Sequence, residues 1–510
     1  MSGKTSRLMV VLAACLLVAT TATAETVGTW RRHEILMPNE SWQGNPFDVR
    51  CTGTFTSPSG RQMEQFAFYA GDDTWKIYFM PDEVGRWTFE TSSPDPQLDG
   101  REGSFRCTES DLPGMLHGRG ARWQLTETGP DFPVIWAPPE KGRWWAFRSA
   151  EADESYIRHQ LRLADETAGA RLLGIGDIAL APRDWAADMP QSAVPYVRGK
   201  EGRRFYLPFW DHLNDVLDRA RERGMGLYVM FFSDDALTPD YLGIEARSRA
   251  ERRLFRYAVA RLGCYPMVLW DSGIDIGEYR SNEWVNWFTR WFRRHDPWGH
   301  PVGSRSGGGS GGTIPDAATY YSNGLHTMPA RDELVRLLDR DEPTAFTDHW
   351  RIFIGRGNWT NRKIRAVHWL CGLSGGHATF PDYSQGFEGG AEPAKMKEGA
   401  RFVGHAVRFF RRELRWSYEK LVPHDELIVE GDGAVLSANP GREYVLYDED
   451  GGPVTVDLSG AKGPLRVLWY NPRTGETTDR RLVSDPGREQ FSPPSESRDY
   501  VLHAWVPADR

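Results

Sequence analysis

The sequence lacks the features that mark several classes of protein. It has 5 Cys in 510 residues, too few for a fold held together by disulfides, and no Cys/His spacing typical of a metal site. No basic stripe accompanies the formal net charge of −8, which argues against nucleic-acid binding. The apolar run at residues 8–18 is too short to span a membrane. We therefore expect no metal, no cofactor, no nucleic-acid partner and no transmembrane span.

Aromatic residues, in contrast, are plentiful. The chain contains 21 Trp, 18 Tyr and 24 Phe. Aromatic rings stack on sugars, but they also fill protein cores, so the composition fits a carbohydrate-handling protein and a set of aromatic-rich cores equally well. A chain of this length exceeds one ordinary core, and two or three domains are expected.

The first 24 residues have the pattern of a secretory signal. A basic start precedes the apolar run, and Ala22-Thr-Ala24 forms a small-residue cleavage site before Glu25. We expect a secreted or periplasmic protein. A lipoprotein anchor at Cys15 is the alternative, but the apolar residues that follow it are unlike the usual polar tether.

The remaining four cysteines divide into two pairs. Cys51 and Cys107 lie towards opposite ends of one predicted β domain, and a disulfide between them depends on a geometry that the sequence does not give. Cys264 and Cys371 are far apart in the middle region, where buried free thiols are the expected state.

The periodicity of the apolar residues changes twice along the chain. Residues 25–112 contain short alternating strands separated by turns, which indicates a β-sandwich. Residues 120–415 alternate between strand and helix patterns, which predicts a parallel sheet or a (β/α)8 TIM barrel. Residues 423–510 return to short strands and suit a second, small β-sandwich.

The middle region contains eight candidate strands. They are 132–136, 172–175, 227–232, 267–270, 302–305, 318–321, 344–347 and one near Gly375-Gly-His377. Helical patterns between them end at Gly169 and Gly224, and Ser281 or Asn282 is placed to cap the helix that follows the fourth strand. In that helix Trp284, Trp287, Phe288 and Trp291 recur at helical spacing, which is more typical of a core than of a sugar platform.

Two acidic residues follow strand-like runs. Asp275, in the segment 266–278 (PMVLWDSGIDIGE), lies just beyond the fourth predicted strand, and Asp348 follows the seventh. Active sites of (β/α)8 barrels lie at the carboxyl ends of the strands, and glycoside hydrolysis requires two carboxyl groups. Each Asp taken alone is more often a helix cap or a loop hydrogen-bonder, so the pair carries the prediction.

Several motifs resemble one family of enzymes. Residues 45–50 (NPFDVR), 79–87 (FMPDEVGRW) and 98–105 (LDGREGSF) resemble the sandwich called domain of unknown function 5060, which precedes glycoside hydrolase barrels of the clan A type. Residues 265–270 (YPMVLW) and 295–301 (HDPWGHP) resemble those barrels, and residues 469–475 (WYNPRTG) resemble a terminal β module labelled putative collagen-binding. The resemblance covers nearly the whole chain after the signal.

This resemblance implies where the catalytic residues lie, and at these positions the chain departs from the family's usual residues. Such barrels carry an acid/base Glu after strand four and a nucleophile Glu after strand seven, and Asp275 and Asp348 match these positions. Both are Asp, and Ile274 replaces the usual Asn or Glu. Each Asp in place of Glu shortens the side chain by one carbon–carbon bond, about 1.5 Å. Two shortenings widen a retaining gap of ~5–5.5 Å towards the ~6.5–9.5 Å that admits a water, so we hypothesise an inverting or otherwise altered mechanism. Glu278, whose side chain is one carbon longer, is the alternative acid.

Other polar and aromatic residues fall near the inferred strand ends. Binding to sugar hydroxyls is expected for Asp177, Asp234, Asp235, Glu278, Arg305, Tyr321, His349 and His377, and stacking on sugar rings for Trp136 and Trp350. Helix caps and loop hydrogen bonds explain each of them equally well. Arg305 can pair with a uronate or sulfate in bidentate fashion, which favours an acidic or sulfated polysaccharide.

The sequence therefore predicts a secreted glycoside hydrolase built as a sandwich, a (β/α)8 barrel and a small sandwich. A non-catalytic carbohydrate-binding protein on a decayed barrel is the first alternative, because both catalytic Glu positions are occupied by Asp. A surface adhesion protein whose β modules do the work is the second.

Overall fold

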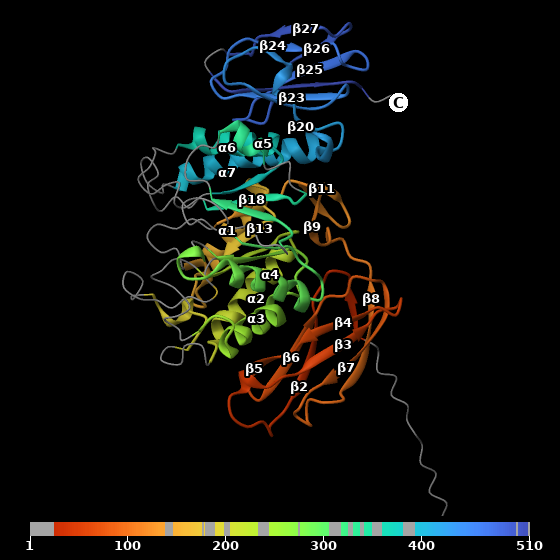
Figure 1. The fold of residues 1–510 in the computed structure, drawn as a ribbon, viewed down its shortest axis with the longest axis vertical. Helices are drawn as coiled ribbons and strands as arrows, with labels where there is room; N and C mark the ends of the chain where they lie inside the picture. The colour runs from red at the N-terminus through yellow and green to blue at the C-terminus, as the bar shows by residue number, and fades with distance from the viewer. Residues whose placement is uncertain are drawn as a thin grey trace, which may run out of the picture.

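The fold comes from a computed structural model, in which three groups of elements follow one another along the chain. The structure describes residues 25–137, 146–175, 178, 189–197, 204–232, 244–273, 276–304, 318–324, 330–336, 341–348, 360–380, 393–495 and 498–507. In Figure 1 mostly antiparallel N-terminal strands lie at the bottom, a set of helices and parallel strands in the middle, and antiparallel C-terminal strands at the top. The molecule is thus a multidomain protein in which β modules flank a parallel sheet.

The N-terminal module (residues 26–108) consists of two sheets. One has the order β1 (Thr26–Gly28), β8 (Glu102–Thr108), β7 (Gly85–Ser92), β3 (Thr52–Thr56) and β4 (Gln62–Phe66). The other has the order β2 (His33–Pro38), β6 (Thr74–Phe79) and β5 (Phe68–Gly71). As the alternation predicts, Trp75, Ile77 and Phe79 are all buried, and Phe79 stacks on Phe55 of the other sheet with ring centres 3.7 Å apart.

The two cysteines of this module are not paired. Cys51 and Cys107 are both buried free thiols. Cys107 pairs with Gly85 at one end of β7, whereas Thr52, next to Cys51, pairs with Ser92 at the other end. Seven residues of strand separate these points by about 23 Å, far beyond the reach of a disulfide. The sequence leaves a Cys51–Cys107 disulfide open, and in the structure the two thiols are free.

Eight parallel strands form the sheet at the centre of the molecule. Their order is β16 (Val302–Gly303), β15 (Val268–Gly273), β14 (Gly226–Phe232), β13 (Leu172–Ile175), β12 (Ile135–Trp136), β19 (His377–Phe380), β18 (Thr344–Asp348) and β17 (Tyr321–Gly324). The two outermost strands also approach each other, because the amide of Thr319, just before β17, donates to the carbonyl of Val302 at 2.9 Å. The sixth strand begins at Tyr321, where the sequence places its end.

Helices alternate with these strands along the chain. They are α1 (Glu154–Arg162), α2 (Leu207–Arg221), α3 (Arg249–Leu262), α4 (Asn282–His295), α5 (Arg331–Arg336), α6 (Asn361–Leu373) and α7 (Pro393–Arg408). The predicted cap is confirmed, since Ser281 accepts a hydrogen bond from the amide of Trp284. Gly224, with φ +64°, follows α2 as predicted. Trp284 and Phe288 of α4 are buried, so the aromatic stripe belongs to the core.

A small antiparallel sheet covers the amino ends of the parallel strands. This end sheet consists of β9 (Leu116–Arg119), β10 (Arg122–Leu125) and β11 (Gly129–Asp131). Trp123 is buried and its indole N–H donates to the carbonyl of Thr344 at 3.4 Å. Leu116 packs in one cluster with Leu269 of the parallel sheet. The end sheet therefore fills the space between the first residues of the strands.

The C-terminal module (residues 422–505) again has two sheets. The larger has the order β20 (Val422–Pro423), β22 (Val435–Asn439), β23 (Glu443–Asp448), β28 (Tyr500–Trp505), β25 (Leu465–Tyr470) and β26 (Thr477–Val483). The smaller contains β21 (Ile428–Glu430), β24 (Val454–Asp457) and β27 (Arg488–Phe491). In Figure 1 the larger sheet lies over α6 and α7. Trp369 of α6 stacks on Tyr447 with ring centres 5.9 Å apart.

The N-terminal module packs on the opposite part of the middle region. Gln65 donates through its side-chain amide to the carbonyl of Val259 in α3 at 3.3 Å, and the hydroxyl of Tyr257 donates to the carbonyl of Tyr69 at 3.1 Å. Among the described residues, the helices are all too short or too polar to cross a bilayer.

Candidate functional site at the carboxyl ends of the parallel strands

The two predicted catalytic positions follow strands of the same parallel sheet. β15 ends at Gly273, two residues before Asp275, and β18 ends at Asp348. Asp348 pairs through its backbone with Gly324 of β17. Because the strands are parallel, their carboxyl ends meet at one edge of the sheet. In the sheet order, β16 and β17 separate the two strands on one side and four strands separate them on the other.

A glycine fixes the end of β15. Gly273 has φ +134°, and a Cβ added there would lie 2.0 Å from the carbonyl oxygen of Phe232 in the neighbouring strand. Its amide donates to the carboxylate of Asp271 at 2.9 Å. Only glycine tolerates this backbone and this approach, so the chain leaves β15 in a defined direction.

A buried carboxylate lies just below this glycine. Asp271 has no exposed surface, and its Oδ2 accepts hydrogen bonds from the hydroxyls of Tyr228 at 3.0 Å and Tyr320 at 3.1 Å. Burial, and next the charge of Asp271, raises the pKa of Tyr320 well above its ordinary range. Asp271 therefore ties β14, β15 and the start of β17 together beneath the carboxyl edge.

The segment after Asp275 is also anchored. The 3-10 turn η8 (Ile276–Glu278) is followed by Arg280, whose amide donates to the carbonyl of Ile276 at 2.8 Å. The guanidinium of Arg280 donates to the carbonyl of Ile244 at 3.0 Å and lies 3.6 Å from the carboxylate of buried Glu251. Buried polar contacts thus hold the chain on both sides of Ile274 and Asp275.

Seven of the predicted site residues lie outside the described part of the chain. They are Asp177, Asp234, Asp235, Asp275, Arg305, His349 and Trp350. Glu278 ends η8. Tyr321 begins β17, so its backbone lies at the amino end of that strand and not at the predicted carboxyl end.

His377 occupies a different end of the sheet from the one predicted. It begins β19 and does not follow a strand, and its fully buried ring lies 5.6 Å from that of Trp123 in the end sheet. Burial lowers the pKa of His377 to about 3. The expectation that it binds sugar at the carboxyl edge is therefore wrong.

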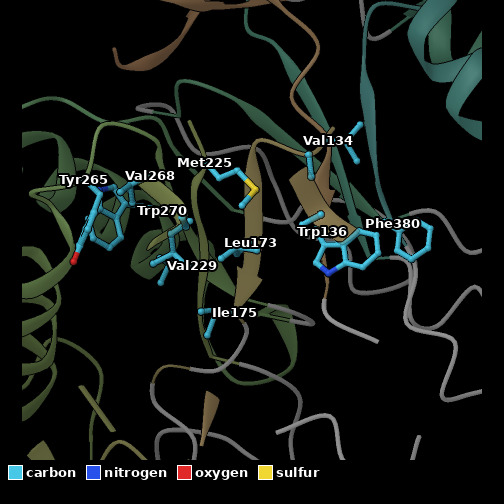
Figure 2. Close-up of a cluster of buried hydrophobic side chains, with 14 of the residues drawn as sticks. Val134, Trp136, Leu173, Ile175, Met225, Val229, Tyr265, Val268, Trp270 and Phe380 are labelled. Carbon is cyan, nitrogen blue, oxygen red and sulfur yellow. The ribbon is translucent and has the colours of Figure 1, made fainter. Parts of the chain in front are cut away.

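Trp136 packs as a core residue. Its ring has no exposed surface and stacks on that of Phe380 with centres 4.3 Å apart. Figure 2 shows the two rings next to each other. Its indole N–H donates to the side chain of Gln160 in α1 at 3.1 Å. The ring therefore points into the layer between the sheet and the helices, and it is not the expected stacking face for a sugar.

The sequence did contain a signal for the buried carboxylate. Leu269 lies in the cluster that faces the end sheet, and the two-residue period of a strand puts Asp271 on the same inner side. An acid at an inward position of a buried strand requires hydrogen-bond donors, but the strand pattern alone does not name Tyr228 and Tyr320. Within the described part of the chain, no three His, Cys, Asp or Glu residues form a metal-binding group.

Two family models match the ends of the chain. Residues 26–94 match the model described as "domain of unknown function (DUF5060)". Residues 422–504 match the model described as "putative collagen-binding domain of a collagenase". Both matches confirm the resemblance drawn from the motifs at the two ends.

Solved structures cover the part between them. A putative glycoside hydrolase from Bacteroides vulgatus ATCC 8482 is similar over 94% of this chain and 99% of its own, with a TM-score of 0.75 and 17% identity. The chain has a glycosidase-like fold flanked by these two modules. A glycoside hydrolase family 5 structure from the same organism covers 77% of this chain and 94% of its own, with a TM-score of 0.59 and 14% identity.

A third glycoside hydrolase structure is similar to the same extent. It covers 78% of this chain and 98% of its own, with a TM-score of 0.59 and 14% identity. At such identities the likeness concerns the glycosidase-like fold and not the reaction. No curated protein matches the sequence.

Proposed function

We propose that the chain is an exported glycoside hydrolase that cleaves O-glycosidic bonds at the carboxyl edge of a closed (β/α)8 barrel. The observation that carries the proposal is the position of two acids in a glycosidase-like fold. Asp348 ends β18 and Asp275 follows β15 by two residues. The hydrogen bond between Thr319 and Val302 supports closure of the sheet into a barrel.

Asp275 is proposed as the general acid and Asp348 as the base or nucleophile. The contacts of Gly273 and Arg280 support this role, because a catalytic carboxyl group needs a backbone that holds its position. Two Asp in place of two Glu favour a wider gap between the carboxyl groups, and hence direct attack by water with inversion.

Single Asp275→Asn and Asp348→Asn variants, assayed on a panel of neutral and acidic polysaccharides, test the assignment. Each is expected to lose at least 100-fold in kcat/KM, in keeping with general acid–base catalysis. Asp215→Asn on α2 is the matched control, since this exposed carboxylate lies on an outer helix. Loss of activity in Glu278→Gln with full activity in Asp275→Asn would reassign the acid.

The stereochemistry gives a second test. Proton NMR of the first-formed anomer should show inversion at the anomeric carbon. Net retention would show that the two shorter side chains still reach the distance of a double displacement, and would contradict the inverting mechanism.

A carbohydrate-binding protein without hydrolytic activity is the second candidate. The replacement of both catalytic Glu by Asp, with Ile274 before the first, favours it. Glycan binding that is unchanged in Asp348→Asn, with no turnover in the unmodified chain, would support this candidate. Binding retained by residues 423–510 alone would instead support an adhesion role of the C-terminal module.

Export is part of the proposal. The pattern of residues 1–24 supports cleavage before Glu25, with release to the periplasm or the medium. N-terminal sequencing of the protein recovered outside the cytoplasm should begin at Glu25. A lipid-modified Cys15 at the new N-terminus would contradict this route.

A further inference from the structure

A cleft of about 490 Å³ lies between the N-terminal module and helices α3 and α4. Its walls are the 3-10 turn η1 (Pro46–Asp48) with the chain that follows, the end of β4 with the start of β5, and one side of α3. Phe255 of α3 faces Phe231 of β14 with ring centres 5.1 Å apart, whereas Arg252 and Arg256 line the cleft. The cleft is thus outside the parallel sheet and separate from the site proposed for catalysis.

Five arginines and one histidine line the cleft, and none of the lining residues that the structure describes is acidic. The arginines are Arg50, Arg249, Arg252, Arg253 and Arg256, the histidine is His295, and we call the site the arginine cleft. Asp48, which lies at the edge, pairs with Arg253 at 2.6 Å and more loosely with Arg249 at 3.4 Å. One carboxylate therefore serves two of five guanidinium groups.

The other three arginines are without an acidic partner. Arg50, Arg252 and Arg256 form no side-chain hydrogen bond or ion pair within the described residues, although the charge of Asp48 partly offsets the lowered pKa of Arg256. Arg256 is half-buried, and burial, followed by the charges of Arg50 and Arg253, lowers its pKa to about 10. Partial burial of an unpaired cation next to like charges costs stability, and a bound anion would offset that cost.

Six of the other lining residues are Phe, Tyr or Trp. Trp291 and His295 of α4 stack with ring centres 4.3 Å apart, and Phe66 lies 6.1 Å from His295 on the other wall. Phe66 and Tyr69 are half-buried, so part of each ring remains accessible. Guanidinium groups pair with sulfate or carboxylate in bidentate fashion, and aromatic rings cover the apolar faces of sugar rings.

We propose that the arginine cleft binds a carbohydrate that carries sulfate or carboxylate groups, at a site separate from the carboxyl ends of the parallel strands. The cleft volume suits a ligand of a few sugar units. The choice of a sugar over a bare inorganic anion rests on the proposed function. Binding itself does not, because no residue of the cleft belongs to the proposed catalytic pair.

The test uses the full mature chain and isothermal titration calorimetry at 50 and 250 mM NaCl. The probes are a sulfated ι-carrageenan tetrasaccharide, a tetragalacturonate, uncharged neoagarotetraose and sodium sulfate. The affinity for at least one charged tetrasaccharide is expected to be at least tenfold higher than the affinity for the neutral one. Its affinity should fall at the higher salt concentration, because salt screens charge pairs of this partly exposed kind.

The variant Arg50→Ala/Arg256→Ala should weaken that binding at least tenfold. Arg106→Ala is the matched control, because Arg106 is an exposed arginine of β8 in the same module and lies away from the cleft. The affinity of this variant for the charged tetrasaccharide should stay within twofold of that of the unmodified chain. Thermal melting tests whether the double variant folds. Its melting temperature should not fall, since an unpaired half-buried charge has been removed.

Three outcomes would overturn the inference. They are equal affinity in the double variant, equal affinity for the neutral tetrasaccharide, and binding of sulfate ion alone without gain from the sugar. The Asp348→Asn chain should bind the charged tetrasaccharide as tightly as the unmodified chain. Arginine-dependent binding without hydrolysis of any substrate would therefore uphold this site and reject the proposed activity, and hydrolysis without such binding would do the reverse.

Discussion

Arg365 of α6 and Asp499 of the C-terminal module form a buried, bidentate ion pair, with Nε–Oδ2 at 2.5 Å and Nη2–Oδ1 at 2.9 Å. The two side chains are only 6% and 3% exposed. Asp499 also accepts hydrogen bonds from Tyr447 at 3.2 Å and from Arg473 at 2.5 Å. This carboxylate therefore joins the C-terminal module to the helices beneath it.

Removal of that carboxylate should loosen the attachment. Asp499→Ala leaves two guanidinium groups without their anion in a buried place, and we expect a loss of about 3–5 kcal/mol in the free energy of unfolding. Asp450→Ala is the control, because its ion pair with Arg362 is exposed and its loss should cost at most about 1 kcal/mol. Urea unfolding followed by tryptophan fluorescence measures both. Equal effects of the two variants would contradict the role of Asp499.

The hydroxyl of Tyr320 should contribute to the stability of the folded chain. Tyr320→Phe removes one of two tyrosine donors to the buried carboxylate of Asp271, which should cost about 1.5–3 kcal/mol. Tyr196→Phe is the matched control, because the buried hydroxyl of Tyr196 has no hydrogen-bond partner among the described residues. Its loss should be neutral or stabilising in the same urea experiment, and a cost equal to that of Tyr320→Phe would show that the network contributes nothing.

The end of β15 should tolerate no side chain. Gly273→Ala combines an unfavourable φ with a Cβ placed 2.0 Å from the carbonyl of Phe232. We expect a loss of about 2–4 kcal/mol and a fall in hydrolysis, because the chain leading to Asp275 must move. Gly460→Ala, where nothing lies within 4 Å of the added Cβ, should change neither the melting temperature nor the rate by a measurable amount.

Stability should fall in mild acid because of His377. Its pKa is about 3 in the folded chain, lowered by burial from its usual 6.5. Between these values the unfolded chain binds a proton that the folded chain does not, so stability decreases as the pH falls from 6.5 towards 3. The slope should be about 1.4 kcal/mol per pH unit for this residue.

Denaturation midpoints at pH 7, 6, 5 and 4 measure the effect. His377→Phe keeps the ring in the core and should lower the slope without abolishing it, because burial also lowers the pKa of His368 and His405 to about 4. His159→Gln, at an exposed position of α1, should leave the slope unchanged. The same slope in His377→Phe as in the unmodified chain would assign the acid sensitivity to other groups.

The alternating strands and helices could be predicted because their signals are local. Residues 227–232 form a short apolar run, and all of them belong to β14. The buried ring of Phe288 follows from a 3.6-residue period in the same way. Such patterns require no knowledge of distant parts of the chain.

The errors concern relations that no local pattern contains. The short strands around Leu116 and Trp123 are stabilised by contacts with strands far away in the sequence, so no local pattern predicts the end sheet. The sequence predicts His377 and Tyr321 near the carboxyl ends of their strands, whereas each of them begins its strand, since an apolar run does not mark where pairing begins. The pair Asp275 and Asp348 rests on the position of two acids after strand-like runs and on a resemblance, and it stays a prediction.

The end sheet restricts the route by which a sugar chain can enter and leave the molecule. Trp123 and Leu116 close the space at the amino ends of the parallel strands. If the strands form the proposed barrel, a sugar chain cannot thread through it and leave on the far side. Substrate would arrive, and product would depart, through the same opening. Each turnover must then clear that opening before the next can begin, and a product slow to leave would act as its own inhibitor.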